Sequence, residues 1–387
     1  MTREADRPRR VALVTSSFAP HVGGVEEHVA QVARGLAAAG HTVEVWAVDR
    51  GDRPAEPFGH GVVVRYLPTP LPARSLGSMA RFVTRAPAAW RAWTQAHRSL
   101  KPDVVHVHCF GPNGLYALAL HRRYRTPLVI TSHGETTGDD TSVFARSALL
   151  RDGLRRSLAA AAAVTAPTDY VLTDLRKNFG LSGGEVVANG VDLHVATGPT
   201  PISGRYILAV RRLGWMKGVD LLIDAFAVGR VRGTIAADVR LVIAGDGPER
   251  ERLEEQIFAA GLLDDVTMLG WQDAEQVASL TAGAEAMVVP SRDEAFGIVA
   301  LEAWRDAAPL IMTTRGGARE FTTDGVDAVL VDPEDTDALA STLARVLSDD
   351  TLRSRLTSAG LTRVREFSWG AVTQKYLDVY QRVLKRR

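Results

Sequence analysis

The sequence is poor in cysteine: Cys109 is the one cysteine among 387 residues. A single cysteine cannot form an internal disulfide bond, and it argues against a metal cluster held by cysteine thiolates. We therefore expect Cys109 to behave as a small buried apolar residue.

Long apolar runs are also missing. The opening residues 1–10 are polar and basic, and the apolar stretch behind them is broken by Thr15, Ser16 and Ser17. The sequence therefore favours neither a signal peptide nor a membrane-spanning helix. No low-complexity tract or fixed-period repeat is evident, so we expect a globular protein that stays in the cytoplasm.

A third deficit is local, because residues 57–102 contain no acidic side chain. The basic residues of this stretch are Arg65, Arg74, Arg81, Arg85, Arg91, Arg98 and Lys101. Pro87 fits the first turn of a helix that carries Trp90, Trp93, His97 and Leu100 on its apolar face. Residues 74–101 could then lie on an anionic membrane at the inner face or hold an anionic acceptor. They could equally form a helix whose arginines only face water.

Nucleic acid is a poor candidate partner. The whole chain has a net charge of +1, and no nucleic-acid recognition motif is visible. The charge is divided unevenly, however, with a net of +6 over residues 1–196 and −5 over residues 197–387.

The length of the chain predicts two domains, since 387 residues exceed what one compact core normally holds. Strand and helix patterns alternate throughout, which indicates an α/β fold with parallel sheets. Strands are expected at 11–15, 42–48, 62–67, 104–107, 128–132, 163–166 and 185–188, and then at 206–210, 240–244, 266–269, 286–289, 310–312 and 328–331. We expect two Rossmann-like domains, an N-terminal one over 1–196 and a C-terminal one over 197–367. The turn-rich segment 189–203 would link them, and the last helix, within 368–387, would cross back to the first domain.

Two carboxylates, Glu294 and Glu302, flank the expected start of a helix near Gly297. Carboxylates accept hydrogen bonds from hydroxyl groups, whereas a helix N-terminus offers free N–H groups and a positive dipole end to phosphate. A ligand with many hydroxyls and a phosphate would need both. Without other signals, two solvated glutamates on a surface helix would explain the pair equally well.

Cations and glycines follow other expected strands. Arg212 and Lys217 come after the apolar run 206–210, at the carboxyl end of a strand, where open parallel sheets bind ligands. They can offset the charge of a diphosphate without a metal. Gly316 and Gly317 follow the run 310–312 and would let main-chain N–H groups approach a phosphate closely. A strand, a loop with Gly23-Gly24 and an amphipathic helix open the chain.

These motifs, in this order and spacing, resemble the family 4 glycosyltransferases. The resemblance covers nearly the whole chain and also includes residues 103–108, His133-Gly134, 189–192 and 245–248. Arg211 departs from the family pattern, since glycine is common there, and Ala188 replaces a usual proline. The residues Trp304 to Ala307 also stand where small residues and a glycine usually end the helix.

The resemblance implies the GT-B architecture, in which two Rossmann-like domains with parallel sheets face each other across a deep cleft. It makes 1–196 the acceptor-side domain and 197–367 the nucleotide-sugar-binding domain. It also implies retaining transfer of a hexose-type sugar from a nucleotide-diphosphate sugar to a hydroxyl acceptor, with no cofactor and no metal. The catalytic candidates are His133, Arg212, Lys217 and Glu294. The donor-binding candidates are Gly23, Gly24, Arg212, Lys217, Trp271, Glu294, Phe296, Gly297, Ile298 and Glu302.

Each candidate has an expected role. Arg212 and Lys217 would hold the diphosphate, and the glycine loops would complete its cradle. By the resemblance, Glu294 would contact hydroxyls of the donor sugar and Glu302 the ribose hydroxyls. His133 would reach the sugar from the other domain and stabilise the departing group, while Trp271 would border the nucleobase.

Other expectations remain open beside these. We expect His106 and His108 to face opposite sides of one strand and to be mainly structural. A nucleotide-sugar epimerase, a sugar phosphorylase and a non-catalytic nucleotide binder use similar scaffolds. A dinucleotide-dependent oxidoreductase is disfavoured, because the first loop lacks the Gly-x-Gly-x-x-Gly spacing.

Overall fold

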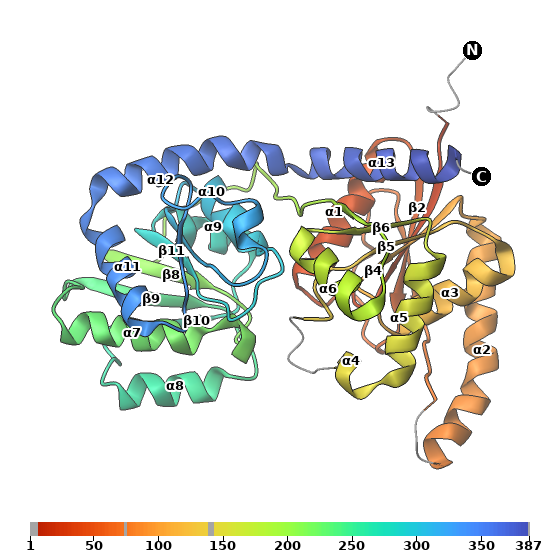
Figure 1. Cartoon of the computed structure of the whole chain (residues 1–387), viewed down its shortest axis with the longest axis horizontal. Helices are drawn as coiled ribbons and strands as arrows, with labels where there is room; N and C mark the ends of the chain where they lie inside the picture. Colours follow the sequence, from red (N-terminus) through yellow and green to blue (C-terminus); the bar gives the residue numbers. More distant parts are fainter. Residues whose placement is uncertain (1–6, 73–75, 138–142, 386–387) are drawn as a thin grey trace. The chain divides into compact units, whose positions relative to one another are not determined.

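The computed structural model describes residues 7–72, 76–137 and 143–385. The chain forms two compact units, Met1–Asn189 with Trp369–Arg387 and Gly190–Ser368. The boundary after Asn189 falls inside the turn-rich segment 189–203. Each unit is an α/β domain built on a parallel sheet, so the expected fold class is confirmed (Figure 1).

The first unit contains a seven-stranded parallel sheet in the order β3-β2-β1-β4-β5-β6-β7. Its strands are β1 (Arg10–Thr15), β2 (Thr42–Val48), β3 (Val63–Leu67), β4 (Val104–His108), β5 (Leu128–Thr131), β6 (Ala163–Ala166) and β7 (Glu185–Val186). Its helices are α1 (Gly24–Ala38), α2 (Leu76–Leu100), α3 (Pro112–Tyr124), α4 (Val143–Arg146), α5 (Ala148–Ala160), α6 (Asp169–Phe179) and α13 (Trp369–Lys385). The strands lie within two residues of the positions expected from the sequence.

Helix α13 completes the core of this unit. Its buried residues Tyr376 and Tyr380 pack in one apolar cluster with Val29 and Leu36 of α1 and with Leu13 of β1. Strands such as β1 are apolar at successive positions because helices cover both faces of a parallel sheet. The last helix of the chain thus belongs to the same compact unit as the first strand.

The second unit contains a six-stranded parallel sheet in the order β10-β9-β8-β11-β12-β13. Its strands are β8 (Arg205–Val210), β9 (Val239–Ala244), β10 (Val266–Gly270), β11 (Ala286–Val289), β12 (Leu310–Thr313) and β13 (Val329–Val331). Its helices are α7 (Val219–Val231), α8 (Arg250–Ala259), α9 (Ala274–Ala282), α10 (Ile298–Arg305), α11 (Thr336–Ser348) and α12 (Asp350–Arg363). Each sheet has one switch point, where two neighbouring strands are not consecutive in the sequence: β1 lies beside β4 in the first sheet, and β8 lies beside β11 in the second. Open parallel sheets bind their ligands at such switch points.

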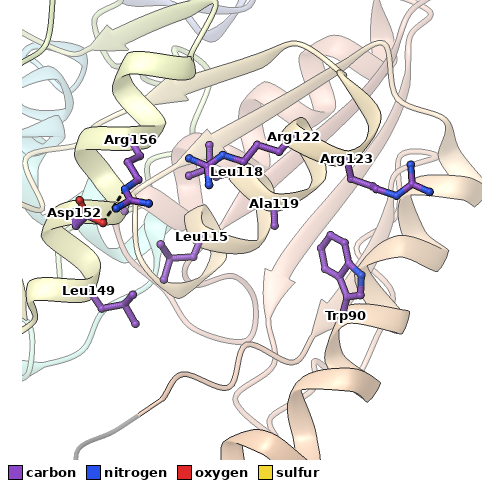
Figure 2. A pocket seen from close by; sticks show the side chains of 10 residues that line it. Trp90, Leu115, Leu118, Ala119, Arg122, Arg123, Leu149, Asp152 and Arg156 are labelled. Atoms are coloured by element: carbon purple, nitrogen blue, oxygen red, sulfur yellow. Dashed lines mark ion pairs between the residues drawn. The ribbon is translucent and has the colours of Figure 1, made fainter.

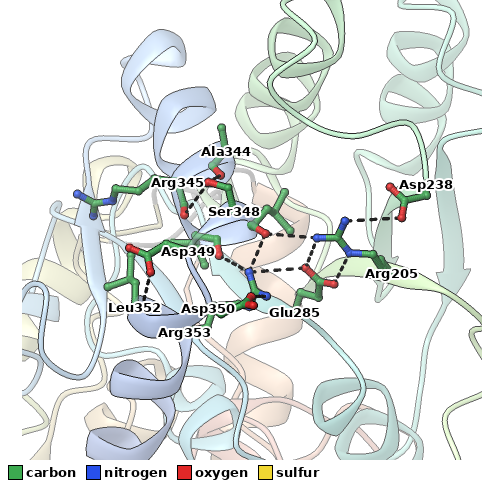
Figure 3. Close-up of polar contacts among 12 residues, drawn as sticks. Arg205, Asp238, Glu285, Ala344, Arg345, Ser348, Asp349, Asp350, Leu352 and Arg353 are labelled. Carbon is green, nitrogen blue, oxygen red and sulfur yellow. Dashed lines mark hydrogen bonds and ion pairs between the residues drawn. The ribbon is translucent and has the colours of Figure 1, made fainter.

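A polar network ties the α11–α12 junction to the amino ends of β8 and β11 (Figure 3). Arg205, the first residue of β8, donates to the two carboxylate oxygens of Glu285 at 2.5 and 2.9 Å. Arg353 of α12 donates to the main-chain oxygens of Val346 and Leu347 at 2.8 and 2.7 Å. The network lies at the end of the sheet opposite the carboxyl ends of the strands, so its role is structural.

Helix α2 differs from its expected form. It begins at Leu76, so Pro87 lies inside the helix rather than in its first turn. A proline removes one hydrogen bond from a helix, and in this long helix Pro87 lies at an exposed position. On the expected apolar face Trp93, His97 and Leu100 are buried, while Trp90 is half-buried. Arg81, Arg85, Arg91 and Arg98 are exposed, and Arg74 lies outside the described residues.

No helix in the part of the chain that the structure describes is both long enough and apolar enough to cross a bilayer.

Candidate active site

The loops that follow β8 and β11 meet at the switch point of the second sheet. The main-chain N–H of Arg292, after β11, donates to the carbonyl of Met216, after β8, at 2.9 Å. The Arg292 guanidinium binds both carboxylate oxygens of Asp220 at 2.8 and 2.7 Å and stacks on Trp215, 4.5 Å from its ring centre. The two loops are therefore fixed to each other at the point where ligands bind in such sheets.

Gly316 and Gly317 pack directly against the main chain of Glu294. Gly316 has a φ of 92°, and a Cβ there would lie 2.2 Å from the Glu294 carbonyl oxygen. The N–H of Gly317 donates to the same oxygen at 2.9 Å. Our expectation that these N–H groups approach a phosphate is therefore wrong for Gly317, whose N–H is used to hold the Glu294 loop.

The carboxylate of Glu294 is buried and surrounded by donors. Ser291 Oγ donates to Oε2 at 2.8 Å, and the Nη2 of Arg211 donates to the same oxygen. Lys217 Nζ lies 3.2 Å from Oε2 and 3.4 Å from Oε1. Oε2 thus has three donors, whereas Oε1 faces only the more distant contact with Lys217.

The donors around Glu294 keep it ionised. Burial alone would raise the pKa of this carboxyl, but the charges of Lys217 and Arg211, with hydrogen bonds from Ser291 and Arg211, outweigh burial. Together they lower the pKa from 4.5 to about 2. Glu294 is therefore a fixed hydrogen-bond acceptor at neutral pH.

Arg211 is the residue that the sequence interpretation missed. We assigned the first cation of this loop to Arg212, yet Arg212 is exposed, and it is the Arg211 side chain that is buried, with 4% of its surface exposed. Its Nη2 also donates to Ser291 Oγ at 2.7 Å. Its departure from the family pattern noted in the sequence was a signal, because the arginine side chain has to fit between closely packed loops.

Helix α10 presents its N-terminus beside Glu294. Gly297 starts the helix with a φ of 88°, and a Cβ there would lie 3.1 Å from Met312 and 3.2 Å from Glu294 Cγ. Ile298 and Val299 form the start of the helix, where N–H groups have no partner within the helix, whereas the N–H of Ala300 donates to the carbonyl of Gly297 at 2.9 Å. Phe296 is turned into the core, stacked on Phe321 at 4.2 Å, so only its main chain could contact a ligand.

Two other donor-binding candidates lie elsewhere in the second unit. Glu302 is half-exposed inside α10, and its charge acts on Arg305 one turn later. Trp271 follows β10 and is 59% exposed, so an aromatic face is open to solvent there.

In the first unit, Gly23 and Gly24 stand at the start of α1. Gly23 precedes the helix, and a Cβ on it would lie 2.6 Å from the Glu26 carboxylate.

The single cysteine, Cys109, follows β4 and has a φ of 55°. Its side chain is half-buried, so our expectation of a buried cysteine was wrong.

His133 follows β5 and lies among other histidines. Its Nε2 is 3.2 Å from Nδ1 of His108, and its ring centre is 4.7 Å from that of His28. We expected His106 and His108 to face opposite sides, which is wrong: residues two apart on a strand share a face, and their ring centres are 4.0 Å apart. Burial lowers the pKa of His133 and of His108 well below 6.5, so both imidazoles are neutral at pH 7.

A buried carboxylate, also missed from the sequence, fixes the loop of His133. Glu135 accepts hydrogen bonds from the main-chain N–H groups of Phe110 and His133 at 2.8 and 2.7 Å, and from Ser132 Oγ at 2.8 Å. Burial raises its pKa, although these hydrogen bonds oppose the change. The structure therefore holds the main chain of His133 in a single position.

A surface pocket of about 490 Å³ lies between α2, α3 and α5 (Figure 2). Trp90, Leu115, Leu118 and Leu149 supply its apolar lining. Arg122, Arg123 and Arg156 supply its cationic side chains, and Arg156 is paired with Asp152 at 2.8 Å.

The sequence of the chain matches two family models. Residues 22–195 match the Glycosyltransferase Family 4 model, and residues 199–363 match the model of the Glycosyl transferases group 1. The alpha-D-kanosaminyltransferase of Streptomyces kanamyceticus is 30% identical over 72% of this chain and 77% of that protein. The chain belongs to the family 4 glycosyltransferases.

Other relatives of this glycosyltransferase agree over its full length. The D-inositol 3-phosphate glycosyltransferase of Xylanimonas cellulosilytica is 29% identical over 98% of both chains. Sucrose-phosphate synthase from Thermosynechococcus elongatus has a similar fold, with a TM-score of 0.80 at 22% identity over 98% of this chain and 100% of that one. The Anabaena protein HepE, solved with UDP-glucose, gives a TM-score of 0.74 at 20% identity over 96% of this chain and 99% of that one. The glycosyltransferase therefore has the GT-B type of fold.

Proposed function

We propose that this glycosyltransferase moves a hexose-type sugar from a nucleotide-diphosphate sugar to a hydroxyl acceptor, with retention of configuration and without a bound metal. One observation carries the proposal. The carboxylate of Glu294 is held ionised by Arg211 and Lys217 beside the N-terminus of α10, at the switch point of the second sheet.

This arrangement suits the charges that glycosyl transfer develops. Breaking the bond between the anomeric carbon and phosphate leaves negative charge on the diphosphate and positive charge on the sugar ring. The α10 N-terminus and the half-exposed ammonium of Lys217 can stabilise the diphosphate, while Glu294 Oε1 can accept a hydrogen bond from a sugar hydroxyl. These groups make a metal unnecessary for holding the diphosphate.

The first unit would supply a neutral imidazole. Because burial keeps His133 uncharged, it would act as a hydrogen-bond donor toward the departing group rather than as a cation. No residue is assigned as a nucleophile, so transfer on one face of the sugar through a short-lived ion pair is preferred over a covalent intermediate.

The acceptor is proposed to be a small polar molecule with ring hydroxyls. The name of one relative supports this choice, since it is a D-inositol 3-phosphate glycosyltransferase. For the donor, UDP-glucose is a sensible first candidate because HepE was solved with it.

A panel of nucleotide-diphosphate sugars screened by thermal shift tests the donor proposal. Binding stabilises the native state, so a preferred donor at 100 times its Kd should add about 2.7 kcal/mol to the unfolding free energy. Stabilisation by a sugar donor with turnover only when an acceptor is added supports transfer. Donor conversion without acceptor would indicate an epimerase, and a requirement for phosphate would indicate a phosphorylase.

We also propose that α2 contacts an anionic membrane. Its exposed residues include Arg81, Arg85 and Arg91 together with Met79 and Val83, which are 42% and 62% exposed. The neighbouring pocket adds Arg122 and Arg123 around an apolar lining (Figure 2). Each basic side chain near such a surface contributes about 1 kcal/mol, which predicts reversible, salt-sensitive adsorption.

Sedimentation with liposomes tests the membrane proposal. Wild type should pellet with anionic liposomes at low salt and not with neutral ones, and a variant with Arg81, Arg85, Arg91 and Arg98 changed to Gln should remain in the supernatant. Equal pelleting of the two proteins would contradict a membrane role for α2. A changed acceptor KM without liposome binding would instead indicate that α2 holds an anionic acceptor.

A further inference from the structure

Three buried or half-buried histidines meet in the first unit, and we call them the histidine cluster: His28 of α1, His108 of β4 and His133 after β5. One ring nitrogen from each of the three lies within 4.8 Å of the others. They come from three separate elements, so the fold and not the local sequence brings them together. Glycosyl transfer as proposed uses only one of them, His133.

The spacing of the cluster matches a metal centre. Two histidine nitrogens bound to one tetrahedral zinc ion at about 2.05 Å are about 3.4 Å apart. The Nδ1 of His108 and the Nε2 of His133 are 3.2 Å apart. His28 lies within 4.8 Å of the other two and would exchange the contact of its Nε2 with the Tyr376 hydroxyl for the ion, while His133 is only partly buried.

A second observation concerns the partner of His28. Its Nδ1 lies 2.9 Å from the amide oxygen of Asn189, which can only accept, so Nδ1 carries the proton. The lone pair is thereby placed on Nε2, which the Tyr376 hydroxyl faces at 3.0 Å. Histidines that bind metals are oriented in this way, by a second acceptor on the nitrogen that does not bind the ion.

The metal-free cluster is also incompletely hydrogen-bonded. The Nδ1 of His108 and the Nε2 of His133 face each other, and only one proton can be shared between them. An ion would give both facing lone pairs a common partner. The Nε2 of His108 would then carry the proton of that ring, and this atom is buried without a hydrogen-bond partner among the described residues.

We propose that the histidine cluster binds one divalent transition-metal ion of the zinc type, and that the bound ion inhibits sugar transfer by occupying His133. The ligands are neutral imidazoles, so the ion needs no proton release from the protein. Water or an anion would complete the coordination, because the cluster supplies three ligands.

The test is titration of the whole protein with Co²⁺, whose visible absorption reports tetrahedral coordination, followed by displacement with Zn²⁺. Wild type should bind one Co²⁺ per chain with tetrahedral bands at pH 7.5. His28→Gln and His108→Gln should each weaken binding at least about tenfold. His121→Gln, a control outside the cluster, should bind as wild type does.

Variants of Asn189 keep the test decisive if a histidine variant does not fold. Asn189→Asp strengthens the acceptor on His28 and should tighten Co²⁺ binding at pH 7.5, whereas Asn189→Leu should weaken it about tenfold or more. Absence of tetrahedral bands in wild type, or equal binding by wild type and Asn189→Leu, would overturn the proposal. These titrations contain no sugar donor, so their outcome does not depend on the proposed transfer reaction.

A second readout is transfer itself. Micromolar Zn²⁺ should inhibit wild type and EDTA should restore its rate, while His121→Gln should show the same inhibition. Tetrahedral Co²⁺ binding without any inhibition by Zn²⁺ would overturn the inhibitory part of the proposal.

Discussion

The Nη2 of Arg211 donates hydrogen bonds to two partners at once, the carboxylate of Glu294 and the hydroxyl of Ser291. Arg211 and Glu294 have side chains that are only 4% and 7% exposed, and they follow the neighbouring strands β8 and β11. The carboxylate expected to contact the donor sugar is therefore oriented by an arginine that occupies the position of a common family glycine. Arg211 is a positioning residue in this arrangement.

The first prediction concerns this buried pair. Arg211→Gly should lower the unfolding free energy by about 3 kcal/mol, because it leaves the Glu294 charge buried with Lys217 as its remaining cation. Urea unfolding measures the loss. Adding Glu294→Gln to Arg211→Gly should recover part of the stability, since the uncompensated charge is then removed. Wild-type stability of the single variant would show that the pair does not hold the loops.

The second prediction concerns the two other cations of the loop. Lys217→Ala and Arg212→Ala should each lower kcat strongly while changing the free energy of unfolding much less. The loss in kcat corresponds to about 3 kcal/mol of transition-state stabilisation, because each variant removes a charge expected to hold the diphosphate. Arg211 still pairs with Glu294 when Lys217 is removed, and Arg212 is exposed, so both variants should fold. Arg232→Ala, on the exposed surface, is the matched control. Near-normal turnover in a folded Lys217→Ala, Arg212→Ala double variant would contradict the site.

The third prediction separates the two glutamates. Glu302→Ala should weaken binding of the nucleoside diphosphate and of the sugar donor alike, because Glu302 is expected at the ribose. Glu294→Ala should weaken binding of the sugar donor much more than that of the nucleoside diphosphate. Calorimetry with both ligands measures the difference, and equal losses for both ligands in both variants would remove this division of roles.

The fourth prediction concerns acid stability. Burial lowers the folded-state pKa of His28 from 6.5 to about 4, so between these values the unfolded chain binds more protons than the folded one. The unfolding free energy should fall as pH decreases from 6.5 to about 4, with about 3 kcal/mol from His28. Urea unfolding across this range, with His28→Gln as the comparison, measures it. An unchanged slope in a folded His28→Gln variant would contradict the contribution of His28.

Glu294 contributes in a lower pH range. Its folded pKa of about 2 is below the ordinary 4.5, so its contribution to stability is present above 4.5 and is lost as pH falls toward 2.

The strands could be predicted from the sequence because apolar runs in parallel sheets are local signals. The meeting of Lys217, Glu294 and Gly317 followed from their places after neighbouring strands. The choice between Arg211 and Arg212 did not follow, since adjacent arginines look alike until packing decides which one is buried. The histidine cluster was also out of reach, because α1, β4 and β5 come together only in the folded sheet.

The start of α2 shows the same limit for a helix. Pro87 is a common first-turn residue, and local pattern alone placed the helix start there. In the structure the helix runs on through the proline from Leu76.

The most direct test of the central claim is the anomeric configuration of the product, followed by NMR while the enzyme works in EDTA. With an α-linked nucleotide-diphosphate sugar and a polyol acceptor, we predict that the first product formed is the α-linked glycoside and that the rate is unchanged by the chelator. A β-linked first product would contradict retention. Complete loss of activity in EDTA, restored by Mg²⁺ or Mn²⁺, would contradict stabilisation of the diphosphate by the protein alone.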